Sequence, residues 1–135
     1  MWATTPSPCS VAKPAEVRAA FDGTVGAGVV DHSLPLQPTC RFLIKGSTFG
    51  ARGGVAVSFA LGESVTSFKV ARNEIKGSSV IRGVGDYAFY DPGTTTVELL
   101  KGKTVAEVQG IFPGANAVKL KAALTALARA VAKHM

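Results

Sequence analysis

The sequence has few charged residues, and it has no long hydrophobic run. Asp, Glu, Lys and Arg make up only 18% of its 135 residues, while hydrophobic residues make up 47%. An intrinsically disordered chain would need the reverse balance, so the composition excludes that class. No stretch approaches the roughly 18 consecutive apolar residues that indicate a membrane-spanning helix. A chain of this length matches one compact domain.

Cysteine is scarce, since Cys9 and Cys40 are the only two. They cannot form a four-ligand zinc site, and neither belongs to a C-x-x-C redox pair. They are therefore either buried free thiols or one disulfide. Cys9 directly precedes a helical pattern and Cys40 opens a β-like run, and these positions at element edges favour the disulfide. Because such a bond persists only in an oxidising compartment, an extracytoplasmic domain is favoured over a cytosolic one.

Recognisable catalytic motifs are missing as well. No Gly-x-Ser-x-Gly, His-Glu-x-x-His or Walker-type loop occurs. His32 follows Asp31, but adjacent strand residues point to opposite faces, and His134 lies next to the C-terminal residue. The nine acidic residues show no spacing that brings two together predictably. We expect no catalytic residue, no metal site and no cofactor. A small hydrolase that uses His32 with Asp31 or Asp86 is the less favoured alternative.

Glycine, proline, valine and threonine are plentiful, and they indicate strands and tight turns. Apolar stripes at helical spacing predict helices over residues 14–22, 63–76 and 116–135. Alternating apolar residues and turn signals predict strands over residues 24–30, 40–45, 55–61, 87–90, 94–100 and 104–111. This order predicts an α+β fold, an antiparallel β-sheet with helices packed on one face. Residues 1–8 are predicted to be an extended N-terminal tail, and residues 9–135 a single α+β domain.

Positive charge prevails, with a formal net charge of +6. From Lys101 onward six Lys and Arg residues stand against one acid, Glu107. These cations are spaced singly, without the Arg clusters or aromatic platform of nucleic-acid modules. They indicate a solvated helix face, and we expect no nucleic-acid partner.

Residues 80–90 combine two glycines with arginine, aspartate and tyrosines. One interpretation is a turn followed by side chains that anchor the core, and it is the favoured one. The other is a candidate binding surface made of Arg82, Asp86, Tyr87 and Tyr90, since exposed Arg and aromatic residues are favoured at interfaces.

Three short segments resemble a known group of proteins. They are Pro8-Cys9-Ser10-Val11, Cys40-Arg41-Phe42 and Val84-Gly85-Asp86-Tyr87-Ala88-Phe89-Tyr90. Together they are similar to small actinobacterial exported or lipid-anchored domains, mostly of unknown function. The resemblance implies paired cysteines and a place at the outer face of the membrane, as a lipid-anchored or sensor-like ectodomain. Lys13 departs from the pattern, which has Thr as the cap of the first helix.

We therefore expect a non-catalytic binding or sensor-like module outside the cytoplasm, secreted or anchored at the outer face of the cell membrane. Its partner is expected to be a protein or a cell-envelope ligand, and it would contact the membrane only through an anchor outside this sequence. The expected surface is the sheet face without helices, or the groove between the sheet and the last helix. A structural subunit of a cell-envelope complex is the alternative.

Overall fold

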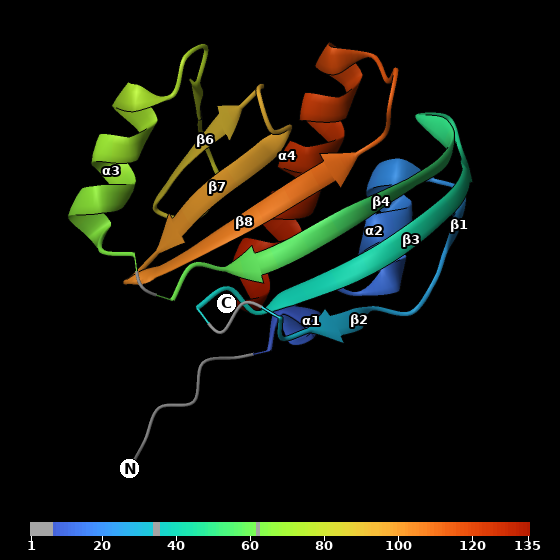
Figure 1. Ribbon diagram of the computed structural model, residues 1–135, viewed down its shortest axis with the longest axis horizontal. Coiled ribbons are helices and arrows are strands. Elements are labelled where there is room, and N and C mark those ends of the chain that lie inside the picture. The colour runs from blue at the N-terminus through green and yellow to red at the C-terminus, as the bar shows by residue number, and fades with distance from the viewer. Residues whose placement is uncertain (1–6, 34–35, 62) are drawn as a thin grey trace.

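The computed structural model describes residues 7–33, 36–61 and 63–135, which form an antiparallel sheet of eight strands and four helices (Figure 1). The helices are α1 (Pro8–Val11), α2 (Pro14–Phe21), α3 (Val65–Glu74) and α4 (Ala117–His134). The strands are β1 (Thr24–Val25), β2 (Val29–Asp31), β3 (Thr39–Ser47), β4 (Gly50–Phe59), β5 (Ser79–Ile81), β6 (Tyr87–Asp91), β7 (Thr96–Lys101) and β8 (Thr104–Ile111). The predicted α+β fold class is confirmed.

The strands are ordered β1-β3-β4-β8-β7-β6-β5, and β2 also pairs with β3. Two long hairpins form the centre of the sheet. The first joins β3 to β4 and closes at the Ser47↔Gly50 pair, while the second joins β7 to β8 and closes at Lys101↔Thr104. The strand β8 then pairs with β4, so the two hairpins form one continuous surface.

One face of the sheet carries the main hydrophobic core. Side chains that alternate along β4, β7 and β8 pack under α1, α2 and α4, and α2 and α4 lie behind the sheet in Figure 1. The helix α4 begins where the Asn116 side chain accepts a hydrogen bond from the Lys119 amide (3.0 Å). The stripe predicted for this helix is buried, and its members are Leu120, Leu124, Leu127 and Val131. Each such side chain contributes roughly 1.5–3 kcal/mol on burial.

The helix α3 packs against the opposite face of the sheet, at the end where β6, β7 and β8 meet. It does so through Phe68, which is fully buried among Phe89, Leu100 and Val105. The side chains of this second cluster alternate with those of the main core, as a pleated sheet requires. Beyond α3, the described residues leave the rest of this face without a helix.

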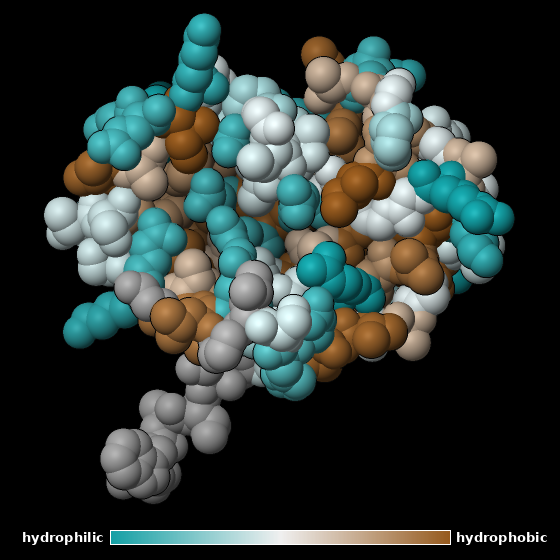
Figure 2. Space-filling model, viewed as in Figure 1, coloured by the Kyte–Doolittle hydropathy of each residue, from teal (hydrophilic) through white to brown (hydrophobic). Residues whose placement is uncertain are grey.

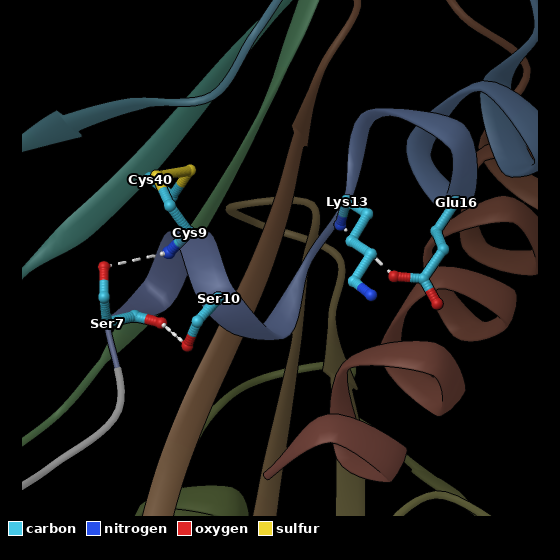
Figure 3. The surroundings of a disulfide bond; sticks show 6 residues. All are labelled: Ser7, Cys9, Ser10, Lys13, Glu16 and Cys40. Atoms are coloured by element: carbon cyan, nitrogen blue, oxygen red, sulfur yellow. Dashed lines mark hydrogen bonds between the residues drawn. A yellow bond between two sulfur atoms is a disulfide. The ribbon is translucent and has the colours of Figure 1, made fainter.

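The two cysteines form a disulfide, and the predicted pair is confirmed. It joins Cys9 in α1 to Cys40 in β3, with the Cα atoms 5.1 Å apart (Figure 3). Cys40 is fully buried in the main core. The bond is consistent with an oxidising extracytoplasmic compartment.

Part of the expected N-terminal tail, residues 7 and 8, lies within the described structure. Residues 1–6 lie outside the described residues, but Pro8 is buried and begins α1. The Ser7 side chain caps that helix by accepting a hydrogen bond from the Cys9 amide (3.3 Å). At Lys13, where a Thr cap was noted as missing, the backbone amide donates to Glu16 Oε1 at 3.2 Å (Figure 3). Among the described helices, none has the length and apolarity to span a bilayer.

The strands near the glycines differ from the predicted ones. The expected strand over residues 24–30 is split into β1 and β2, and residues 26–28 between them belong to no strand. Gly28 packs closely there, since a Cβ at that position would lie 2.6 Å from Cys40 Sγ. The strand β4 begins at Gly50 rather than at residue 55. Gly53 lies inside the strand because the Phe112 ring packs where a side chain at that position would be. The short edge strand β5 was not predicted.

Candidate functional site

The four residues of the predicted binding surface are not brought together. Tyr87 packs edge-on against Phe68 on the α3 side of the sheet, with ring centroids 5.8 Å apart. Tyr90 is only 6% exposed and faces the main core, where Lys121 Nζ lies 5.7 Å from its ring centroid. The two tyrosines are three positions apart on one strand, so the pleat places them on opposite faces.

The segment before these tyrosines forms the favoured turn instead. Asp86 Oδ2 accepts a hydrogen bond from the Gly102 amide (2.7 Å), and Gly83 and Gly85 have positive φ angles. At Gly85 a Cβ would lie 2.6 Å from Leu100 O, so the turn needs glycine there. Arg82 is exposed beside it. The segment is therefore the favoured turn followed by core anchors, and Tyr87 and Tyr90 do not share one surface.

The histidine of the hydrolase alternative has no described carboxylate partner. Asp31 Oδ2 accepts from Arg41 Nε at 3.2 Å, and its Oδ1 accepts from the Ser33 amide at 2.9 Å. These hydrogen bonds lower the pKa of Asp31, with the Ser33 amide as the main cause. Asp86 is held by Gly102. Both carboxylates thus have other partners than His32, which is exposed.

Polar and charged side chains that line pockets lie instead on the part of the sheet opposite α1, α2 and α4, which we call the open face. Figure 2 looks onto this face, and it shows hydrophilic side chains over β7 and β8 and hydrophobic ones nearer β3. The registers place one row of side chains from each of four strands on it. The open face comprises Arg41, Leu43, Lys45, Arg52, Gly54, Ala56, Ser58, Thr96, Glu98, Glu107, Gln109 and Ile111.

A polar pocket of about 290 Å³ lies in the middle of the open face. Gln37, from the loop before β3, reaches over it, and its Nε2 donates a hydrogen bond to Glu107 Oε2. Ser58 Oγ lies 3.5 Å from the same oxygen. The remaining lining is Thr39, Arg41, Ala56, Thr94, Thr96 and Gln109. The pocket therefore offers amide, hydroxyl, guanidinium and carboxylate groups together, which suits recognition of a polar ligand.

Two carboxyl groups adjoin this pocket, at Glu98 and Glu107, directly opposite each other on β7 and β8. Glu98 is only 9% exposed. Burial, and then the charge of Glu107, raise the pKa of Glu98 to about 8. Burial, followed by the same charge, also raises the pKa of Glu63. At neutral pH the pair therefore keeps a proton, because the pKa of Glu98 lies above 7.

This pair was not predicted, although the register of the β7–β8 hairpin follows from the sequence. The loop between the predicted strands was recognised at residues 101–103. A two-residue turn pairs Lys101 with Thr104. Glu98 lies three residues before Lys101, and Glu107 lies three residues after Thr104, so the same register pairs these two acids. No spacing within a single strand reveals it.

An apolar slot of about 390 Å³ lies next to the polar pocket and shares Arg41 and Ala56 with it. Its floor is Gly54, and its walls are Leu43 on β3 and Ile111 on β8, which the registers place on either side of Gly54. The walls are 73% and 48% exposed. The apolar slot is lined by apolar atoms almost throughout, with guanidinium groups at its rim.

Cations surround the apolar slot on β3 and β4. Lys45 and Arg52 lie directly opposite each other in the register, and both are exposed. Like charges in directly opposed positions destabilise a sheet. Within the described part of the chain, ion pairs join Arg41 to Asp31 and His134 to Glu16, and neither involves Lys45 or Arg52.

No family model, curated protein or solved structure compared with this chain matches it. The disulfide alone does not identify an exported actinobacterial domain, so that resemblance stays a prediction. Among the residues that the structure describes, no group of three or more His, Cys, Asp and Glu side chains could hold a metal ion. The functional proposal therefore rests on the geometry of the open face.

Proposed function

We propose that this chain is a non-catalytic binding module that works outside the cytoplasm and holds its ligand on the open face. The observation that carries the proposal is the pair of adjoining pockets, one polar and one apolar, that share Arg41 and Ala56. Concave sites with an apolar lining and a few convergent polar groups are the usual form of ligand sites.

The stability of the isolated domain does not account for the side chains on the open face. Leu43 and Ile111 lie exposed on either side of Gly54, and Lys45 opposes Arg52. Exposed apolar side chains contribute no burial free energy to folding, and opposed cations destabilise the folded state. A ligand that covers the apolar walls and pairs with the cations would compensate both.

The chemistry of the polar pocket favours recognition over bond cleavage. The Glu107 carboxylate accepts hydrogen bonds from Gln37 and Ser58, while the buried Glu98 retains its proton at neutral pH. Gln109 Nε2 is similarly held by Thr94 O at 3.0 Å. These side chains orient one another, as the walls of a preformed binding pocket do.

The disulfide supports this place of action, because such a bond persists in an oxidising compartment. We propose that the module meets a protein or cell-envelope ligand there. Attachment to the outer face of the membrane would require an anchor outside this sequence. No cofactor enters the proposal.

Fragment screening by nuclear magnetic resonance tests the proposed surface. The disulfide-bonded domain, labelled with nitrogen-15, is titrated with short peptides, small saccharides and fatty acids in turn. We expect shift changes at Gly54, Ala56 and Gln109, and their loss in Ala56→Tyr, which fills the boundary between the pockets. Ala122→Tyr, on the exposed side of α4, is the matched control.

Two results would overturn the proposal. One is fragment binding that maps to another surface, such as residues 83–86, or no binding to any fragment class. The other is hydrolysis of a chromogenic ester, peptide or glycoside that disappears in His32→Ala or Glu98→Gln.

A further inference from the structure

We propose that the apolar slot receives an apolar side chain from a partner polypeptide that carries acidic residues on both sides of that side chain. This inference rests on the proposed function and names the class of ligand. It concerns the apolar slot over β3, β4 and the end of β8, whereas the Glu98–Glu107 pair lies on β7 and the middle of β8.

The shape of the apolar slot suits a single inserted side chain. Leu43, Gly54 and Ile111 form one row across three neighbouring strands, so a residue without a side chain lies between two exposed apolar ones. A Cβ at Gly54 would lie 3.1 Å from Phe42 O, and any larger side chain there would fill the apolar slot. Anchors of this kind, seated in a pocket at the centre of an interface, carry most of the binding energy in protein complexes.

The cations repeat along β3 at the spacing of an extended chain. Arg41, Leu43 and Lys45 project onto the same face at every second residue, which corresponds to steps of about 6.6–6.8 Å. Arg52 on β4 stands beside Lys45. A partner segment in extended conformation has the same repeat. It would therefore match this row with the pattern acidic, any residue, apolar, any residue, acidic.

The charges of this row are complementary to such a segment. Lys45 and Arg52 are in no described ion pair, and their mutual repulsion is relieved when a carboxylate lies between them. Arg41 already shares its guanidinium with Asp31, yet it still lines both pockets. The partner's second carboxylate would bind this guanidinium beside Asp31.

Two other anionic ligands fit the open face less well. An acyl chain needs an enclosed cavity that buries most of its surface, whereas the apolar slot is open along the sheet. A nucleic-acid backbone would continue past Arg41 and meet the negative Glu107 within the adjoining pocket. Both become outcomes of the test.

Fluorescence anisotropy with defined peptides tests the inference. The probe is a short labelled peptide with the central order Asp-Ser-Leu-Ser-Asp, compared with one in which Lys replaces both Asp and one in which Ala replaces Leu. We expect saturable binding of the acidic peptide to the disulfide-bonded domain, weakened by high salt because the ion pairs are exposed. Each altered peptide should bind at least about tenfold more weakly.

Variants of the domain locate the site. Leu43→Ser and Arg52→Glu should each weaken binding at least about tenfold, whereas Val118→Ser and Lys119→Glu, at exposed positions of α4, should leave it unchanged. The double variant Lys45→Glu with Arg52→Glu should bind the Lys-substituted peptide in preference to the acidic one. A misfolded variant could not show that exchange of preference.

The inference is overturned if the acidic peptide does not bind, if Arg52→Glu leaves its binding intact, or if the double variant keeps the original preference. Tighter binding of a fatty acid or of single-stranded DNA at the same residues would also overturn it. In these cases fragment shifts on the open face would still support the proposed function, so the two failures are distinguishable.

Discussion

Among the described titratable residues, Glu98 has the pKa that is shifted furthest from its ordinary value. It lies on the open face, opposite Glu107, and the charges of Glu107, Glu63 and Asp91 each disfavour its ionised form. A carboxyl that keeps its proton at neutral pH can donate a hydrogen bond to Glu107, which an ionised one cannot do. The pair therefore carries one negative charge at neutral pH, in the half of the open face that lies away from Lys45 and Arg52.

The raised pKa of Glu98 makes the stability of the domain depend on pH. Glu98 has a pKa of about 8 in the folded state and near 4.5 in the unfolded state. Its contribution to stability is therefore complete below pH 4.5, and it is lost as the pH rises from there through 8. Glu98→Gln should remove this dependence and make the variant more stable than the wild type above pH 8. Urea unfolding midpoints measured between pH 4 and pH 9 check this.

The control for this prediction is Glu74→Gln, at an exposed position near the end of α3. It should keep the wild-type slope. A wild-type midpoint that does not change between pH 5 and pH 8, or an equal slope in Glu98→Gln, would contradict the assignment.

At the scale of single residues, the strand period and the turn register already determine which side chains share a face. The period of two was enough to separate Tyr87 from Tyr90, and the turn register was enough to pair Glu98 with Glu107. The raised pKa of Glu98 could not be predicted, because it depends on burial within the fold and on charges from distant segments, such as that of Glu63. Sequence distance hides such neighbours until the fold is known.

Among the elements, those defined by local contacts were predicted well. The helix α4 and the β7–β8 hairpin depend on neighbouring residues, and both were located within about two residues of their ends. The predicted strand over residues 55–61 omits the glycines of β4, because the contact that explains them is remote in sequence. Gly53 gives room to Phe112, a residue beyond the end of β8 that no local pattern connects to it.

The helix α3 is held to the sheet by one buried side chain, that of Phe68. Phe68→Ala should release α3 while the main core stays folded, because the main core does not include this cluster. A buried Phe replaced by Ala typically loses about 3–5 kcal/mol. Amide hydrogen exchange should therefore become fast over Val65–Glu74 and stay slow over Ala117–His134.

Val70→Ala is the matched control, since Val70 is about half exposed on the same helix. It should leave the exchange of α3 unchanged. Uniform loss of protection in both helices of Phe68→Ala would instead mean that α3 and the main core unfold as one unit.

Across the whole molecule, charge is divided over the open face. Acidic groups lie over β7 and β8, and cations surround the apolar slot on β3 and β4. The net charge of +6 was interpreted as the solvated face of a helix, and α4 does carry exposed lysines at positions 119 and 133. It gave no indication of the second group of cations on the β3–β4 hairpin, which is the one that adjoins a pocket.

The disulfide connects α1 to β3, and its buried cysteine, Cys40, belongs to the main core. It closes a loop with a sequence separation of 31 residues. Removing it by Cys9→Ser with Cys40→Ser should lower the free energy of unfolding by about 3–4 kcal/mol, because the unfolded chain regains the freedom of that loop. Urea unfolding of the variant and of the wild type measures the difference.

The wild type treated with a reductant should lose the same stability as the double variant, and without reductant its mass after alkylation should show no free thiol. Equal stability of the two proteins, or two alkylated cysteines in the untreated wild type, would contradict the bond and remove the main support for an extracytoplasmic module. If the loss is found, a reducing cytosol would leave the domain several kcal/mol less stable than an oxidising compartment does. Since typical domains are stable by only about 5–15 kcal/mol, that difference ties the working fold to the place where its disulfide can form.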